Sequence, residues 1–183
     1  MASAPLLALA AIAATPTSAQ TAEVGFNTAL AACESWILEP ATHAEDVNSF
    51  EKRSHLDGRI ERQGKLPDIA LPPPDLRVNL RSWRVPVGTG GYFVTVSDRL
   101  PMCHIAGGGS DDFQPGIESA LKALVSSGRW KTIENRRTDD ALSTQLVHGL
   151  HRKFVLIVTR AAHPGSRTDR PQVIATARYD IGE

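Results

Sequence analysis

The sequence predicts an α+β fold: an antiparallel sheet of about six to seven strands, with a central amphipathic helix and N-terminal helices packed on one face. Two observations lead to this prediction. Apolar residues, many of them β-branched or aromatic, alternate with polar ones along several short segments, which is the period of pleated strands. Short links separate most of these segments, which favours antiparallel pairing. The expected order is two helices, three strands, one helix and four strands.

Residues 1–19 predict a secretory signal peptide. Residues 4–14 form an unbroken apolar run that is too short to span a bilayer. Thr17, Ser18 and Ala19 then supply the small residues that a signal peptidase reads, so we expect cleavage after Ala19. No Lys or Arg precedes the apolar run, so either the signal is atypical or the true start codon lies upstream. We therefore expect a periplasmic or secreted protein.

Residues 20–183 predict a single domain with three parts: N-terminal helices at 20–58, an irregular Pro-rich connection at 59–80, and the sheet with its central helix at 81–183. No later apolar run is long enough for a membrane helix, and the net charge of zero gives no argument for nucleic-acid binding. Charge is unevenly spread, since no Lys or Arg precedes Lys52 and the C-terminal third is basic. We interpret this as contact between acidic helices and a basic sheet.

The first helix carries its apolar residues on one face. Phe26, Leu30, Cys33 and Ile37 recur at helical spacing, and Pro40 ends the pattern. The residues before Cys33 also match a lipobox. In a lipoprotein signal the apolar region runs directly into that cysteine, whereas polar residues precede it here, so we expect no lipid there.

A second helix is expected from about His43 to His55. Thr42 and Glu45 have the spacing of a capping box, and the apolar face is thin, with Val47 and Phe50, which favours a place on the surface. The proline run at 71–74 then predicts a stiff, extended spacer rather than a ligand for a partner.

Seven segments have the pattern of strands. They are residues 83–87, 92–97, 102–106, 130–134, 143–148, 153–160 and 172–179. Between the third and the fourth lies the central helix, whose apolar positions follow one helical face: Ile117, Ala120, Leu121, Leu124 and Val125.

The ends of the central helix have recognisable signals. Ser110, Asp111 and Asp112 are N-cap residue types, Pro115 suits a first turn, and Gly128 is a suitable stop. The preceding glycines, residues 107–109, are expected to form a loop that lets the chain turn into the helix.

The two cysteines, Cys33 and Cys103, form an even pair in a protein expected to be exported. Such pairs usually become bridges, so we expect a disulfide that ties the first helix to the second strand of the central hairpin.

No catalytic motif stands out. The loop from Gly107 to Asp112 lacks the spacing of a phosphate loop, and its carboxylates would repel a phosphate. A triad of Ser110, His104 and Asp111 is conceivable, but Ser110 lies outside a GxSxG elbow and closeness in sequence does not establish triad geometry. A role in binding remains open for the same three residues, His104, Ser110 and Asp111.

Metal binding is not expected either. His148 and His151 combined with Cys103 and His104 would supply four zinc ligands, but neither HExxH nor CxxC spacing supports such a site. We expect surface or hairpin histidines, no metal and no cofactor.

The function expected from these features is a small, exported, disulfide-stabilised and non-enzymatic module. Its partner would be another exported protein or an envelope component. The alternative is a small exported hydrolase that uses His104 and the Gly107–Asp112 loop. The sequence indicates no oligomeric state.

Overall fold

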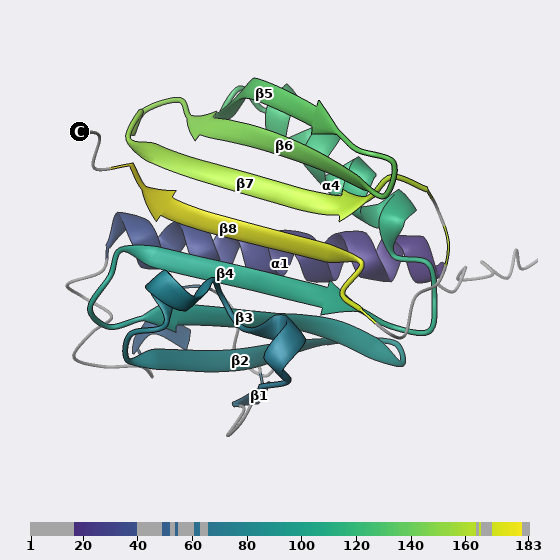
Figure 1. The fold of residues 1–183 in the computed structure, drawn as a ribbon, viewed down its shortest axis with the longest axis horizontal. Helices are drawn as coiled ribbons and strands as arrows, with labels where there is room; N and C mark the ends of the chain where they lie inside the picture. Colours follow the sequence, from purple (N-terminus) through teal and green to yellow (C-terminus); the bar gives the residue numbers. More distant parts are fainter. Residues whose placement is uncertain are drawn as a thin grey trace, which may run out of the picture.

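The computed structural model describes residues 17–39, 49–51, 54, 61–62, 66–163, 165 and 170–180. In this part of the chain, helices cover one face of a single antiparallel sheet, which confirms the predicted α+β fold class (Figure 1). Most of the predicted signal peptide, residues 1–16, lies outside the described residues, so its removal stays a prediction.

Within the described ranges the sheet has eight strands, in the order β1-β2-β3-β4-β8-β7-β6-β5. Strand β1 has two residues and the others have seven or eight, so the seven long strands match the expected number. The strands are β1 (Glu61–Arg62), β2 (Leu80–Val87), β3 (Gly90–Ser97), β4 (Met102–Gly108), β5 (Trp130–Arg137), β6 (Ala141–His148), β7 (Phe154–Ala161) and β8 (Val173–Tyr179).

Two antiparallel meanders make up this sheet. Strands β2 to β4 form one and β5 to β8 form the other, as short turns between alternating segments require. The last strand, β8, pairs with β4 and places Thr176 opposite His104, which joins the two meanders (Figure 1). Helix α4 (Gln114–Ser126) connects β4 to β5 across the meander boundary.

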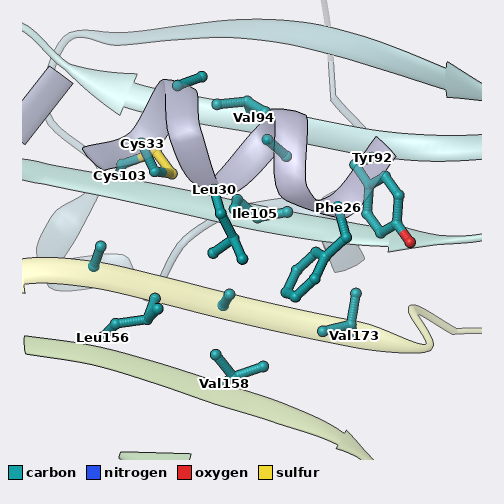
Figure 2. Packing of buried hydrophobic residues seen from close by; sticks show 14 of the residues in the cluster. Phe26, Leu30, Cys33, Tyr92, Val94, Cys103, Ile105, Leu156, Val158 and Val173 are labelled. Atoms are coloured by element: carbon teal, nitrogen blue, oxygen red, sulfur yellow. A yellow bond between two sulfur atoms is a disulfide. The ribbon is translucent and has the colours of Figure 1, made fainter. Parts of the chain in front are cut away.

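Helix α1 (Ser18–Leu38) lies along the sheet and forms the centre of the core (Figure 1). Thr17 and Gln20 close a capping box at its start, so the predicted cleavage after Ala19 falls inside its first turn. Figure 2 shows Phe26, Leu30 and Cys33 among the buried side chains of the sheet. The other labelled side chains there belong to β3, β4, β7 and β8: Tyr92, Val94, Cys103, Ile105, Leu156, Val158 and Val173.

The predicted second helix is described only in part. Residues 49–51 are helical, whereas the rest of 43–55, apart from Ser54, lies outside the described residues. Phe50 is 0% exposed, and its ring centroid lies 5.1 Å from that of Trp36 and 5.2 Å from that of Trp83. Phe50 of the thin apolar face therefore inserts its ring into the core, where it makes an edge-to-face contact with Trp36 and a tilted contact with Trp83.

Helix α4 confirms the expected helix and part of its expected cap. It begins at Gln114, and the Asp112 carboxylate accepts the Gln114 N–H at 3.0 Å. Ser110, predicted as an N-cap residue, lies too far before the helix and hydrogen bonds to the Thr89 hydroxyl instead. Gly128 follows the helix at φ +72°, a conformation that glycine adopts without the strain of a Cβ atom.

The Pro-rich connection packs against the sheet rather than acting only as a spacer. Two short 3₁₀ turns, η1 (Asp68–Ala70) and η2 (Pro74–Leu76), lie on the face opposite α1 (Figure 1). Leu66, Ala70 and Pro72 are buried. This segment forms one wall of the cleft described next.

Candidate ligand-binding cleft

A cleft of about 570 Å³ lies on the sheet face opposite the helices, at the end where the β2–β3 hairpin turns. Its floor is apolar, with Phe93 on β3 and Ala106 on β4 as paired neighbours. Ile69 of the Pro-rich connection forms an apolar wall beside this floor, and its side chain is 56% exposed. The remaining lining residues are Pro67, Ala70, Arg84, Thr89, Gly90, Gly91, Gly107, Gly108, Gly109, Ser110, Arg170 and Pro171.

The glycine run shapes one side of the cleft, and the sequence interpretation of it needs correction. Gly107 and Gly108 belong to β4, which extends beyond the predicted end at residue 106. A Cβ atom on Gly107 would lie 2.1 Å from Cδ1 of Tyr92, so the missing side chain makes room for that ring. The Tyr92 hydroxyl donates to the Ala22 carbonyl at 2.9 Å, and burial raises the pKa of this phenol. Gly107 therefore allows Tyr92 to pack closely between the sheet and α1.

Gln172 holds the loop after β4 in place, a role that no sequence motif signals. It is 2% exposed, and its Nε2 donates to the carbonyls of Gly109 at 2.9 Å and Asp111 at 2.7 Å. Its Oε1 accepts the Phe113 N–H at 2.7 Å. One buried amide thus satisfies three backbone groups at the cleft rim, where unpaired groups would be costly.

The charged side chains among the described lining residues are two arginines. Arg84 lies half-buried across the hairpin and donates to the Gly90 carbonyl at 2.8 Å, while Arg170 is exposed on the opposite rim. Among the lining residues that the structure describes, none is Asp or Glu. Two guanidinium groups beside an apolar floor suit a ligand that joins an anionic group to an apolar body.

The three residues predicted as binding candidates occupy different places. Ser110 lines the cleft beside Thr89. Asp111 lies at the rim, where its Oδ2 would be 3.6 Å from a Cβ atom on Gly88. His104 lies two residues before Ala106 on the same face of β4, about 7 Å away at the rise of a strand, and it is not among the lining residues. The structure therefore brings Ser110 and Asp111 near the cleft and leaves His104 outside it.

His104 is buried in the sheet with little access to solvent. It is 2% exposed, and its Nδ1 lies 2.9 Å from the Thr176 hydroxyl. Burial and the charge of Arg77 lower the pKa of His104 to about 4, so the ring is neutral at pH 7. Neither Ser110 nor Asp111 contacts this ring in the hydrogen bonds given above, so these residues form no nucleophile–base pair.

The expected disulfide between Cys33 and Cys103 is confirmed. Both residues lie in the core, 2% and 0% exposed, and the bridge joins α1 to β4 (Figure 2). Cys103 is therefore a structural residue and not a thiol next to His104. In the part of the chain that the structure describes, no three His, Cys, Asp or Glu side chains group so as to hold a metal ion.

His148 lies in the core rather than on the surface. It is 3% exposed, and its ring centroid lies 5.2 Å from that of His151. Its Nε2 is 3.2 Å from the Glu34 carboxylate on α1, which links an acidic residue of the first helix to the later sheet. The Glu34 carboxylate also lies 3.6 Å from Nε of Arg129, in keeping with the expected contact between acidic helix and basic sheet.

No protein-family model matches this chain, and no characterised protein or solved structure matches it either. Over the described residues, none of the helices has the length and apolar character needed to cross a membrane.

Proposed function

We propose that this protein is an exported, disulfide-stabilised binding module. Its cleft takes an anionic group attached to an apolar body, presented by another exported protein or by an envelope component. The observation that carries this proposal is the cleft itself, where Arg84 and Arg170 flank the apolar floor at Phe93 and no carboxylate lies among the described lining residues. The disulfide between helix and sheet supports a rigid frame for such a site.

The hydrolase alternative has no observation in its favour. It requires His104 to work with the Gly107–Asp112 loop, whereas His104 is buried beside Thr176 and does not line the cleft. The binding module also needs no nucleophile, only shape and charge.

Two simple probes test the cleft: octanoate, which stands for a protein carboxylate, and octyl phosphate, which stands for a phosphorylated envelope lipid. We expect one of them to shift the backbone amide NMR signals of Gly90, Gly91 and the glycines at 107–109. Saturating shifts with octanoate point to a protein segment, and those with octyl phosphate point to an envelope lipid. If neither probe shifts these amides, the cleft does not bind this ligand class.

Arg170→Gln removes one guanidinium from the exposed rim without disturbing the core. We expect binding of the active probe to weaken roughly tenfold, because a hydrogen bond to a charged group contributes about 1.5–3 kcal/mol. Arg99→Gln, an exposed arginine in the turn between β3 and β4 at the other end of the sheet, is the matched control and should bind like the wild type. Equal weakening in both variants would assign the effect to overall charge and not to the cleft.

Export rests on the apolar run at 4–14 and the small residues at 17–19. The intact mass of protein from the exported fraction tests it. We expect a chain that begins at Gln20, without the Thr17 side chain that caps α1 in the full sequence. A retained N-terminus would contradict export by a cleaved signal.

A further inference from the structure

The turn between β6 and β7, residues 149–153, presents an apolar side chain to solvent. Leu150 is 87% exposed, more than any other exposed large hydrophobic residue among those described. His151, Arg152 and Lys153 follow it directly and are exposed. A single exposed Leu is common on protein surfaces and carries little meaning alone. Its surroundings decide what it does.

The side chain of His148 holds the backbone of the β6–β7 turn in place. The Nδ1 atom of the buried His148 accepts the Leu150 N–H at 3.3 Å and the His151 N–H at 3.1 Å. Because Nδ1 accepts, the ring proton lies on Nε2. This Nε2–H donates a hydrogen bond to the Glu34 carboxylate, 3.2 Å away. The ring also packs edge-on against Trp130, with centroids 5.1 Å apart. The fold thus fixes the backbone around Leu150. A contact made by Leu150 therefore loses less conformational entropy than one made by a flexible loop.

Cations surround the turn at this end of the sheet. The exposed ones come from the start of β5, from the turn itself and from the end of β8: Arg129, Lys131, Arg152, Lys153 and Arg178. Two acidic residues lie against them. Glu34 is 14% exposed and is shared between His148 and Arg129, and Asp180 donates its backbone N–H to the Lys153 carbonyl at 2.6 Å. Among the described residues at this end of the sheet, positive charges therefore outnumber negative ones around Leu150.

One exposed leucine surrounded by basic side chains fits a lipid surface better than a protein partner. A stable protein interface buries about 800 Å² on each side around an apolar centre, and one side chain ringed by cations does not supply that. An anionic bilayer needs only an apolar group to insert and basic groups for its headgroups. We propose that the β6–β7 turn docks this protein on an anionic bilayer, with Leu150 inserted among the lipids.

This orientation leaves the ligand cleft accessible. The cleft lies where β2 turns into β3, at the opposite end of the sheet from the β6–β7 turn (Figure 1). Docking through Leu150 would point the cleft away from the bilayer. The inference goes beyond the proposed cleft function and does not depend on it, so either can fail alone.

A Leu150→Trp variant tests the insertion at one residue. The three native tryptophans are 1–2% exposed, so a tryptophan at 150 adds a distinct solvent-exposed signal. The full chain is mixed with vesicles of phosphatidylcholine, with or without phosphatidylglycerol, whose acyl chains carry bromine as a quencher. We expect quenching and a blue shift at 150 with the anionic vesicles only, and a loss of both in 0.5 M NaCl.

An Asp139→Trp variant is the control, because residue 139 is exposed in the turn at the other end of the β5–β6 pair. It should stay unquenched even if the apolar run at 4–14 tethers the chain to the vesicles. Adding Arg152→Gln and Lys153→Gln to Leu150→Trp should weaken vesicle binding roughly tenfold or more, since each cation near an anionic surface contributes about 1 kcal/mol.

Three results would overturn the proposal: no quenching at 150, equal quenching at 150 and 139, or equal quenching with neutral vesicles. A blue shift at 150 that grows with protein concentration in the absence of lipid would also overturn it, because the turn would then mediate self-association. Thiol labelling before and after reduction confirms that each variant retains the folded, bridged state.

Discussion

His104 has only one of its two ring nitrogens paired. Nδ1 lies beside the Thr176 hydroxyl, whereas Nε2 has no hydrogen-bond partner among the described residues. A buried ring in this position stays neutral, because protonation would place a charge where water cannot reach it and where Arg77 repels it. The residue that looked like a catalytic candidate in the sequence therefore couples stability to pH.

The pH dependence of stability follows from the direction of this shift. Burial lowers the pKa of His104 from 6.5 to about 4, so the unfolded chain binds a proton between these values while the folded one does not. The stabilising effect of the neutral ring is fully present above pH 6.5 and is lost as the pH falls toward 4. Between pH 7 and pH 5 we expect this group to lower the free energy of unfolding by about 2 kcal/mol, as measured by urea denaturation.

Carboxylates also titrate in this range, so the comparison with His104→Gln isolates the histidine. The variant should lose about 2 kcal/mol less than the wild type between the two pH values. Parallel losses in both proteins would show that His104 is not the group responsible.

Among the elements, the two helices pack closely because a glycine lies at their contact. A Cβ atom on Gly116 of α4 would lie 2.7 Å from the Glu23 nitrogen of α1 and, in the full sequence before the predicted cleavage, 2.4 Å from the Ala19 carbonyl oxygen. Both contacts are with backbone, which cannot move aside as a side chain can. The sequence shows a glycine in the first turns of a helix, where helix propensity disfavours it, and the fold explains why it is there.

A Gly116→Ala variant separates these two effects. Propensity alone would stabilise α4 by about 1 kcal/mol, whereas overpacking against a helix backbone costs about 1–3 kcal/mol. We expect net destabilisation, seen as a lower midpoint of urea denaturation. Ser119→Ala, on the exposed side of the same helix, is the control and should change stability by at most about 0.5 kcal/mol. A more stable Gly116→Ala protein would mean that the helices can separate without cost.

At the scale of the whole molecule, one bridge ties the central helix to the sheet. Cys33 lies on α1 and Cys103 on β4, the strand that joins the two meanders through its pairing with β8. The bridge therefore fixes the helix against the junction on which both halves of the sheet depend.

Removing this bridge should lower the free energy of unfolding substantially. The two cysteines are 70 residues apart, and closing a loop of that length contributes about 4 kcal/mol in the chain-entropy model. We expect Cys33→Ala with Cys103→Ala to lose most of that amount, measured by urea denaturation.

The accessibility of the bridge is a second readout. Because the sulfurs are buried, the folded wild type should resist mild reductant and expose labelled thiols only when reduction is combined with denaturant. Rapid labelling of both thiols in the folded, unreduced protein would contradict the bridge itself.

Local patterns in the sequence were sufficient for the seven long strands, for the first and central helices and for the bridge. Alternation and short turns predicted the strands, a helical face predicted α4, and an even cysteine pair in an expected export context predicted Cys33–Cys103. These signals depend on neighbours within a few residues or on a simple count. The start of α4 was predicted only in part. Of the three expected cap residues, Asp112 accepts the Gln114 N–H, whereas Ser110 lies too far before the helix and the N-cap position is taken by Phe113, which is not a capping residue type.

Only the tertiary structure decided which distant segments meet. The tertiary structure pairs β4 with β8 and places His104 beside Thr176. It also packs the Tyr92 ring against Gly107, where a side chain would clash. It also places the Pro-rich connection on the sheet face opposite α1. There the connection forms the cleft together with Arg84 and Arg170. The sequence alone determined the periodic elements because periodicity is a local property of the chain. The cleft, and the placement of Arg129, Lys131 and Arg178 near the β6–β7 turn, arise from contacts between residues far apart in sequence. Such contacts form only when the whole core is buried at once.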